Sequence, residues 1–414
     1  MRRKKKPQAR QWASPIKLIK DSLPKEVFVL TAVGFFVAVG YGLIVPAIPL
    51  FARTFGVNQT AIGFIISTFA FARFGSGLIS GKLVDKFGER KVLAFGLIMV
   101  AISSLASGFA QSYIQLLSFR AAGGLGSSMF SVSAGALLMR VTNDDNRSQG
   151  QSFYSSGFLF GGIAGPAFGG ILSAISLRSP FFVYAGTLVI ASVTTIIFLS
   201  EKRLGKKVTA IIDPSDRISI RDALLQYPYR VALVLAFVTN WTIFGLRNSI
   251  LPLFVTEHLH STATVVGFGF TASALAQGFL LIQAGKISDH KGRRFAILCG
   301  TFFLMSALIV LIVAIHPSFY ILAMILFGLG GAFMGTAPAG VVGDLFGGKG
   351  GQVIAVWQMA GDAGMIAGPI ILGALTDAIS YRAAFAVTAA VFSIAIVLAA
   401  TLKETRKSHI SPES

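Results

Sequence analysis

The sequence predicts an all-α membrane protein with twelve transmembrane helices in two pseudo-symmetric six-helix bundles. Composition is the first observation. Of the 414 residues, 54% are hydrophobic and 13% charged, whereas charged residues usually make up about a quarter of a soluble protein. The second observation is a series of twelve apolar runs, each about as long as a helix that crosses the hydrocarbon core. The third is a repeat that relates the two halves of the chain.

The apolar runs are continuous and therefore indicate helices, because a membrane β-barrel would show alternating segments of about ten residues. Their even number places both termini on one side of the membrane. The predicted spans cover residues 26–51, 60–82, 91–110, 113–139, 151–175, 180–200, 230–256, 263–285, 295–315, 317–343, 351–376 and 380–402.

Polar stretches mark the boundaries of the predicted domains. The widest of them separates the sixth span from the seventh, and the termini are also polar. We therefore expect five segments: a basic N-terminal segment at 1–25, a first bundle at 26–200, a central loop at 201–229, a second bundle at 230–402 and a tail at 403–414.

The positive charges predict the orientation. The chain holds 36 Lys and Arg and carries a formal charge of +19. Thirty of the 36 fall in segments on the side of the termini, and Lys and Arg are retained in the cytoplasm. We expect cytoplasmic termini, a plasma membrane location such as the bacterial inner membrane, and contact with anionic headgroups. A nucleic-acid partner is not expected, since the basic residues form no patch on a polar domain.

Short motifs recur between the halves at an offset of 203 or 204 residues. The sequence around Gly81–Lys91 returns at Gly285–Arg294, and the pair Gly124 and Gly126 returns at 328 and 330. The segments Gly161–Pro166 and Pro49–Phe51 also have counterparts. Because each half has an even number of spans, the halves run in the same direction and are related by an axis along the membrane normal.

The loop between the second and third spans resembles a motif of the major facilitator superfamily, and within it of the twelve-helix drug/proton antiporters. The resemblance covers the whole chain and implies that this loop latches the two halves together on the cytoplasmic side. The matching residues are Gly81, Asp85, Lys86, Gly88, Arg90 and Lys91 in the first copy, and Gly285, Asp289, Gly292, Arg293 and Arg294 in the second, where His290 replaces a basic residue. The glycines permit a tight turn, and the aspartate can pair with an arginine or cap a helix. The alternative is a turn that only anchors positive charge on the cytoplasmic side. This alternative would explain the basic residues but not the repeated spacing of the glycines and the aspartate.

Two further motifs strengthen the resemblance. Arg120, followed by Gly124 and Gly126, is similar to a motif that the family ties to proton coupling; its side chain either faces a polar cavity or extends to the outer interface. The fifth span resembles the antiporter motif, although Ser152 stands where the family has a further glycine. Its residues are Gly161, Gly165, Pro166, Gly169 and Gly170. Small residues at this spacing let helices pack closely, and the proline predicts a kink.

Asp362 is the one carboxylate predicted near the middle of the membrane, where charges are normally functional or paired. Arg73 in the second span lies at a similar depth, and the resemblance implies that the second and eleventh spans meet across the halves. We therefore expect an ion pair that holds the cytoplasmic side shut and breaks when Asp362 is protonated or substrate competes. The alternative is that each charge is satisfied within its own half.

Arg247 is the third embedded arginine, and the resemblance implies that it and Arg120 face the substrate path from opposite halves. Three embedded arginines against one aspartate leave a positive interior, which favours a neutral, zwitterionic or anionic substrate over a cationic one. Trp357 and Gln358, one turn before Asp362, are further candidates for the substrate path.

These observations predict a secondary transporter that exports a small amphiphilic molecule in exchange for protons, by alternating access between the halves. A symporter or uniporter for uptake, or a transport-inactive sensor, is the alternative. An enzyme is not expected, because nucleotide loops, metal-binding His clusters and nucleophile motifs are missing from the sequence. The single cysteine, Cys299, excludes disulfides and Cys-based metal sites. We expect no cofactor, no metal, and a monomer driven by the proton gradient.

Overall fold

The computed structural model describes residues 23–142, 146–199, 219–346 and 351–405, and the secondary structure of these residues is helical. The first half contains α2 (Lys25–Ile44), α3 (Ala47–Arg53), α4 (Gln59–Gly75), α5 (Gly77–Phe87), α6 (Glu89–Gly108), α7 (Tyr113–Val141), α8 (Arg147–Ile175) and α9 (Ser179–Phe198). The second contains α10 (Ile220–Leu225), α11 (Tyr227–Asn240), η3 (Trp241–Ile250), α12 (Leu251–Leu253), η4 (Phe254–His258), α13 (Ala263–Lys291), α14 (Arg293–Ile312), α15 (Pro317–Met334), α16 (Ala337–Phe346), α17 (Gly351–Ala378) and α18 (Tyr381–Ala400).

The predicted spans are confirmed. Within the described residues, eleven helical stretches are long and apolar enough to cross a membrane, and α4 with α5 forms a twelfth that bends by 47°. The apolar runs alone do not indicate this bend. It lies at Ser76, whose hydroxyl donates a hydrogen bond to the carbonyl of Ala72, one turn back in α4, and such bonds often bend helices.

The prediction of a loop over 201–229 is wrong at its C-terminal end. Ser219 accepts a hydrogen bond from the amide of Arg221 and begins the short helix α10, and α11 already starts at Tyr227, with Pro228 in its first turn. A proline in the first turn costs no backbone hydrogen bond. The predicted basic segment lies almost wholly outside the described residues, as does most of the predicted tail.

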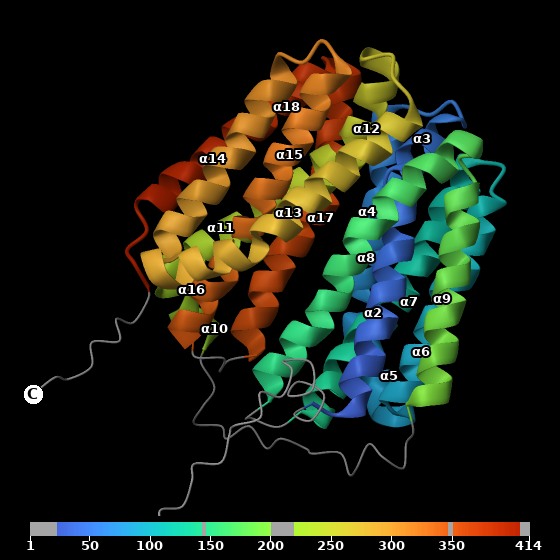
Figure 1. The fold of residues 1–414 in the computed structure, drawn as a ribbon, viewed down its shortest axis with the longest axis vertical. Helices are drawn as coiled ribbons and strands as arrows, with labels where there is room; N and C mark the ends of the chain where they lie inside the picture. The colour runs from blue at the N-terminus through green and yellow to red at the C-terminus, as the bar shows by residue number, and fades with distance from the viewer. Residues whose placement is uncertain (1–22, 143–145, 200–218, 347–350, 406–414) are drawn as a thin grey trace, which may run out of the picture.

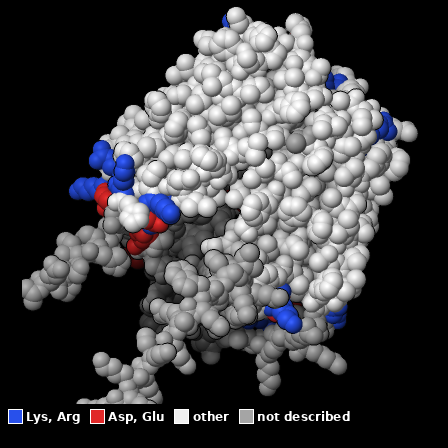
Figure 2. Space-filling view, in the orientation of Figure 1, with Lys and Arg blue, Asp and Glu red and all other residues white. Residues whose placement is uncertain are grey.

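The halves touch at one end of the molecule and separate at the other (Figure 1). We call the upper end, with α3 and α12, the Glu257 end, and the lower end, with the turn between α5 and α6, the Gly88 end. The face drawn in Figure 2 is uncharged over its middle, and a hollow opens between the halves at the Gly88 end. Charge at the ends and apolar surface between them fit a protein that spans a bilayer.

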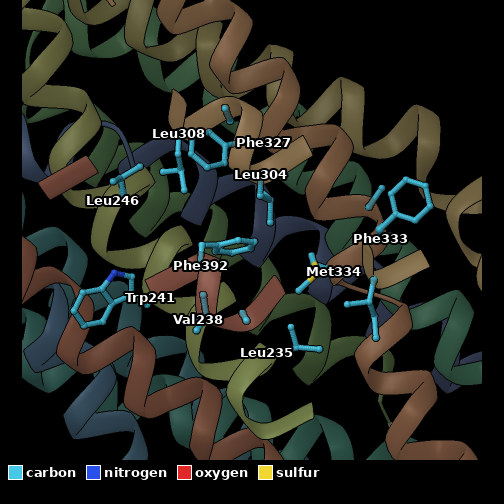
Figure 3. Close-up of a cluster of buried hydrophobic side chains, with 14 of the residues drawn as sticks. Leu235, Val238, Trp241, Leu246, Leu304, Leu308, Phe327, Phe333, Met334 and Phe392 are labelled. Carbon is cyan, nitrogen blue, oxygen red and sulfur yellow. The ribbon is translucent and has the colours of Figure 1, made fainter. Parts of the chain in front are cut away.

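Each half has its own apolar core. Figure 3 shows the cluster in the second half, where side chains of α11, η3, α14, α15 and α18 interdigitate. Trp241 lies at its edge, and its indole nitrogen donates to the hydroxyl of Thr388 at 3.5 Å. Because the main cores lie within the halves, each bundle can move largely as a unit.

Candidate functional site: a transport pathway between the halves

A cavity of about 720 Å³ lies between the halves on the side of the Gly88 end. α4 and α7 of the first half face α11 and α17 of the second across it. Its polar lining includes Arg73, Ser131, Asn240, Gln358 and Asp362, and Trp357 also lies on its wall. Its volume is within the range of pockets that hold small molecules.

Arg73 and Asp362 therefore come from opposite halves and line one cavity. They do not form an ion pair in this structure, where the described ion pairs involve other residues. The pair is predicted for a conformation in which this end is closed, and it stays a prediction.

Trp357 and Gln358 lie one turn before Asp362 on α17 and line the same cavity, which places all three predicted residues together. The indole nitrogen of Trp357 is buried without a hydrogen-bond partner among the described residues. Asn240, which the sequence analysis did not single out, faces them from α11 and donates to the carbonyl of Ala236 at 3.0 Å.

The end opposite the cavity is closed by polar contacts between the halves. Arg53 in α3 forms an ion pair with Glu257 in η4, with Nε 2.6 Å from Oε1. Tyr381 donates to Glu257 Oε2 at 2.6 Å, and Gln59 in turn donates to the Tyr381 hydroxyl at 2.8 Å. The pair joins corresponding regions of the two halves, because Pro49–Phe51 recurs at Pro252–Phe254.

Asp377 at the end of α17 adds a second contact. Its carboxylate accepts hydrogen bonds from the backbone amides of Gln59 and Thr60 at 2.9 and 2.8 Å, and from the Thr60 hydroxyl at 2.6 Å. These amides begin α4, where helix ends bind anions. One turn further, a Cβ on Gly63 would meet the backbone of Pro369, so only a glycine permits this approach of the halves. We call this set of contacts, from Arg53–Glu257 to Asp377, the outer ladder.

An apolar seal lies between the outer ladder and the cavity. Phe69 and Ala70 of α4 pack on Met365 of α17, and Ser67 donates to the carbonyl of Ile366 at 2.6 Å. The seal and the ladder both cross between the halves, so both must open if the pathway is to face the Glu257 end.

Arg120 lies in this seal. Its side chain is only 6% exposed, which argues against an extension to the interface, and its guanidinium lies over the ring of Phe69 at 4.3 Å. The small cavity beside it, lined also by Tyr41 and Asn248, has a volume of about 10 Å³, about that of one water molecule. In this conformation Arg120 is therefore not in the large cavity.

Arg247 lines two cavities, of about 230 and 320 Å³, together with Gln277 of α13. Its Nε donates to Asn248 Oδ1 at 3.3 Å, and its guanidinium lies 5.6 Å from the centre of the Phe270 ring. The residue belongs to the π-helical segment η3, and π-helical turns are frequent at functional sites. Arg247 and Arg120 therefore lie in different surroundings, not in one common chamber.

The predicted motif of the fifth span brings helices together. Cβ atoms on Gly161, Gly165 and Gly169 would meet the backbone of α2, and one on Gly170 would lie 2.7 Å from the Cα of Gly267 in α13. The motif thus packs α8 on its own half and also on the other half. The helix continues through Pro166 without a break.

The loops of the predicted latch contain turns that only glycine adopts readily. Gly88 and Gly292 have φ of 85° and 104° with ψ near 155°, a region almost restricted to glycine. Arg293 bonds Asp289 and Asp344, at 2.6 and 2.9 Å. These contacts join helices of one half, and the latch between the halves stays a prediction.

Sequence reasoning did not single out the residues of the outer ladder, or Gln277. Glu257 and Asp377 fall just after the predicted spans 230–256 and 351–376, and neutral residues such as Tyr381 carry no charge signal. The available clue was the recurrence of Pro49–Phe51 at Pro252–Phe254, which places Arg53 and Glu257 at the same end of the two halves.

Comparisons with known proteins agree with this architecture. The sequence profile of the Major Facilitator Superfamily matches residues 30–246 and again 231–414. The chain is 25% identical to multidrug resistance protein 1 of Bacillus subtilis over 88% of this chain and 93% of that protein. It is 22% identical to the quinolone resistance protein NorA of Staphylococcus aureus over 85% and 90% of the two chains.

Among solved structures, the chain is similar to a bacterial homologue of the human lysosomal transporter Spinster in an inward-facing, unoccupied conformation. The TM-score is 0.75 at 16% identity, over 90% of this chain and 95% of that one. The two profile matches, one on each half, cover most of the sequence. The chain therefore belongs to the Major Facilitator Superfamily, whose members are transporters rather than enzymes.

Proposed function

We propose that this transporter exports a small neutral or anionic amphiphile in exchange for protons. The observation that carries the proposal is the position of Asp362, a carboxylate embedded between the halves, across an open cavity from Arg73. The distribution of Lys and Arg supports a cytoplasmic Gly88 end in the plasma membrane. The structure would then be the inward-facing state, in which Asp362 can exchange a proton with the cytoplasm. No cofactor enters this proposal.

Closure of the cavity would bring α4 and α17 together at the Gly88 end. A deprotonated Asp362 then forms an ion pair with Arg73 and stabilises the closed state, whereas a protonated Asp362 cannot. A proton that arrives from the outside therefore favours opening toward the cytoplasm, where it is released. Substrate leaves by the opposite movement, which couples the two fluxes in opposite directions.

The relatives support export as the direction. Two of them are named for resistance to multiple drugs and to quinolones, which is the phenotype expected of efflux. The three embedded arginines favour substrates that are not simple cations, and a quinolone is amphiphilic and carries a carboxylate. A quinolone is therefore a suitable first probe.

Charge exchange between Arg73 and Asp362 tests the coupling. Asp362→Asn and Arg73→Ala should each abolish most proton-driven quinolone transport in proteoliposomes. The double variant Arg73→Asp with Asp362→Arg should restore part of it, because the pair is re-formed in reverse. Arg230→Asp, at an exposed position of α11, serves as the control for a charge reversal outside the cavity. The pairing is wrong if the folded exchange variant is as inactive as the single variants.

A further inference from the structure

The Arg247 side chain lies in the membrane-spanning part of the molecule without an acidic partner. None of the ion pairs described among residues 23–142, 146–199, 219–346 and 351–405 involves it. Its one described hydrogen bond, to Asn248, is long at 3.3 Å. A charge within the membrane-spanning part without a counterion is costly, and such residues mark substrate or ion pathways.

The position of Arg247 is well suited to a ligand. It stands between two cavities, one inside the second half and one between η3, α13 and α8 of the first half. Gln277 lines both cavities as well. A ligand group held between these side chains would therefore touch both halves of the transporter, as a substrate of an alternating-access protein must.

The remaining lining defines the rest of the ligand. The larger cavity of about 320 Å³ is otherwise apolar, with Phe158, Leu159 and Ile163 of α8 facing Phe270 of α13. A guanidinium binds a carboxylate or phosphate through two parallel hydrogen bonds, and an amide can add another donor. The chemistry of the site is thus one anionic group beside a hydrophobic body.

We propose that Arg247 and Gln277 form an anion subsite, and that the transported amphiphile is an organic anion with its carboxylate or phosphate at Arg247 and its apolar body along α8 and α13. The inference rests on the proposed transport function and narrows its substrate class. Arg73, in the large cavity, faces an acid and remains available for proton coupling. Arg120, beside a cavity of about 10 Å³, has no room for such a group.

Calorimetric binding to the full chain in nanodiscs of phosphatidylcholine, without a proton gradient, tests the subsite. The probes are decanoate and decyl phosphate as anions, decanol as the neutral analogue and decyltrimethylammonium as the cation, with heats from empty discs subtracted. Either anion should bind at least about tenfold more tightly than the cation and the alcohol. Only the anions can accept charge-assisted hydrogen bonds from Arg247.

Arg247→Gln should weaken binding of the anion about tenfold or more and leave decanol unchanged. Arg230→Gln, which removes an exposed arginine of the same span, should change neither. Ala274→Phe keeps the charge but fills the larger cavity, so it should also reduce decanoate binding; this variant tests the site even if Arg247→Gln fails to fold.

The proposal is overturned if the cation binds as tightly as the anions, or if folded Arg247→Gln binds decanoate as the unaltered protein does. Inorganic phosphate that binds as tightly as decyl phosphate would also overturn it, because the apolar wall would then have no role. Since no proton gradient is present, a negative result here leaves the proton-coupling proposal untouched, and failure of proton coupling leaves this binding result valid.

Discussion

Asp377→Ala should shift the transporter toward a state that is open at the Glu257 end. The Asp377 carboxylate belongs to the second half, and all three of its described hydrogen bonds end on Gln59 and Thr60 of the first. These bonds must break when the halves separate at this end. They therefore stabilise only the conformation described here, and their loss acts on the equilibrium between conformations.

The free-energy cost of Asp377→Ala follows from the type of contact that it removes. Asp377 occupies the place of an anion at a helix N-terminus, and the loss of such a contact costs about 1–2 kcal/mol. Each of its bonds would cost more in a buried site, but Asp377 is exposed, so water replaces part of the loss. A change of about 1–2 kcal/mol alters the ratio of the two states about 5–30-fold. The Arg53–Glu257 pair, with side chains 38% and 32% exposed, should contribute at most about 1 kcal/mol.

Double electron–electron resonance measures this ratio. Cys299 is the single cysteine, so a Cys299→Ser background allows spin labels at two chosen positions. Gln111 and Ile315 are exposed, lie at the Glu257 end, and belong to different halves. In the protein with an intact outer ladder, the distances between the two labels should be short. Asp377→Ala should add a population with longer distances.

Asp222→Ala, which removes an exposed acid in the first turn of α10, serves as the control and should leave the distribution unchanged. Asp377→Asn keeps one acceptor oxygen and should give an intermediate result. If Asp377→Ala leaves the distances as they are in a folded protein, the outer ladder does not hold this end closed, and the reasoning is refuted.

Three substitutions test the packing, each through the apparent Tm of the purified protein. Gly165→Val should destabilise by about 1–3 kcal/mol, because its side chain would meet the backbone of α2, whereas Gly186→Ala, with open space around it, should be neutral or stabilising. Gly88→Ala should cost about 1–3 kcal/mol, because alanine does not readily adopt the backbone conformation of Gly88. Gly81 has helical geometry, so Gly81→Ala should not lower the Tm in this way; if both variants had the same Tm, the backbone conformation would not be the cause. Glu89→Ala should cost about 1–3 kcal/mol, because it removes a charge-assisted hydrogen bond of 2.7 Å to Arg140 in a largely buried site; an unchanged Tm would show that the pair contributes nothing.

The spans could be predicted because hydropathy depends only on local composition, and the repeat added the division into halves. The bend between α4 and α5 was not predicted, although Gly75, Ser76 and Gly77 lie at it and kinks often occur at Gly/Ser pairs. The start of α11 was misplaced because Tyr227 and Pro228 read as loop residues, although tertiary packing makes them part of the first turn of a helix.

The candidate site was predicted in part. Embedded charge identified Arg73, Asp362 and Arg247, because the cost of a charge in the membrane is visible in a sequence. Which charges share a cavity depends on how the halves are inclined, and sequence patterns do not contain that information. Gln277 escaped notice for a related reason: a neutral amide in an apolar helix gives a weak signal until its neighbours are known.

Proton movement triggered by substrate tests the central claim of antiport through Asp362 most directly. Everted membrane vesicles with an acidic lumen expose the Gly88 end to the bath, if the orientation is as proposed. Addition of a quinolone or decanoate should make the lumen more alkaline as protons leave in exchange, and Asp362→Asn should abolish the response. Uptake of the labelled probe with no change in pH, or with acidification of the lumen, would contradict antiport.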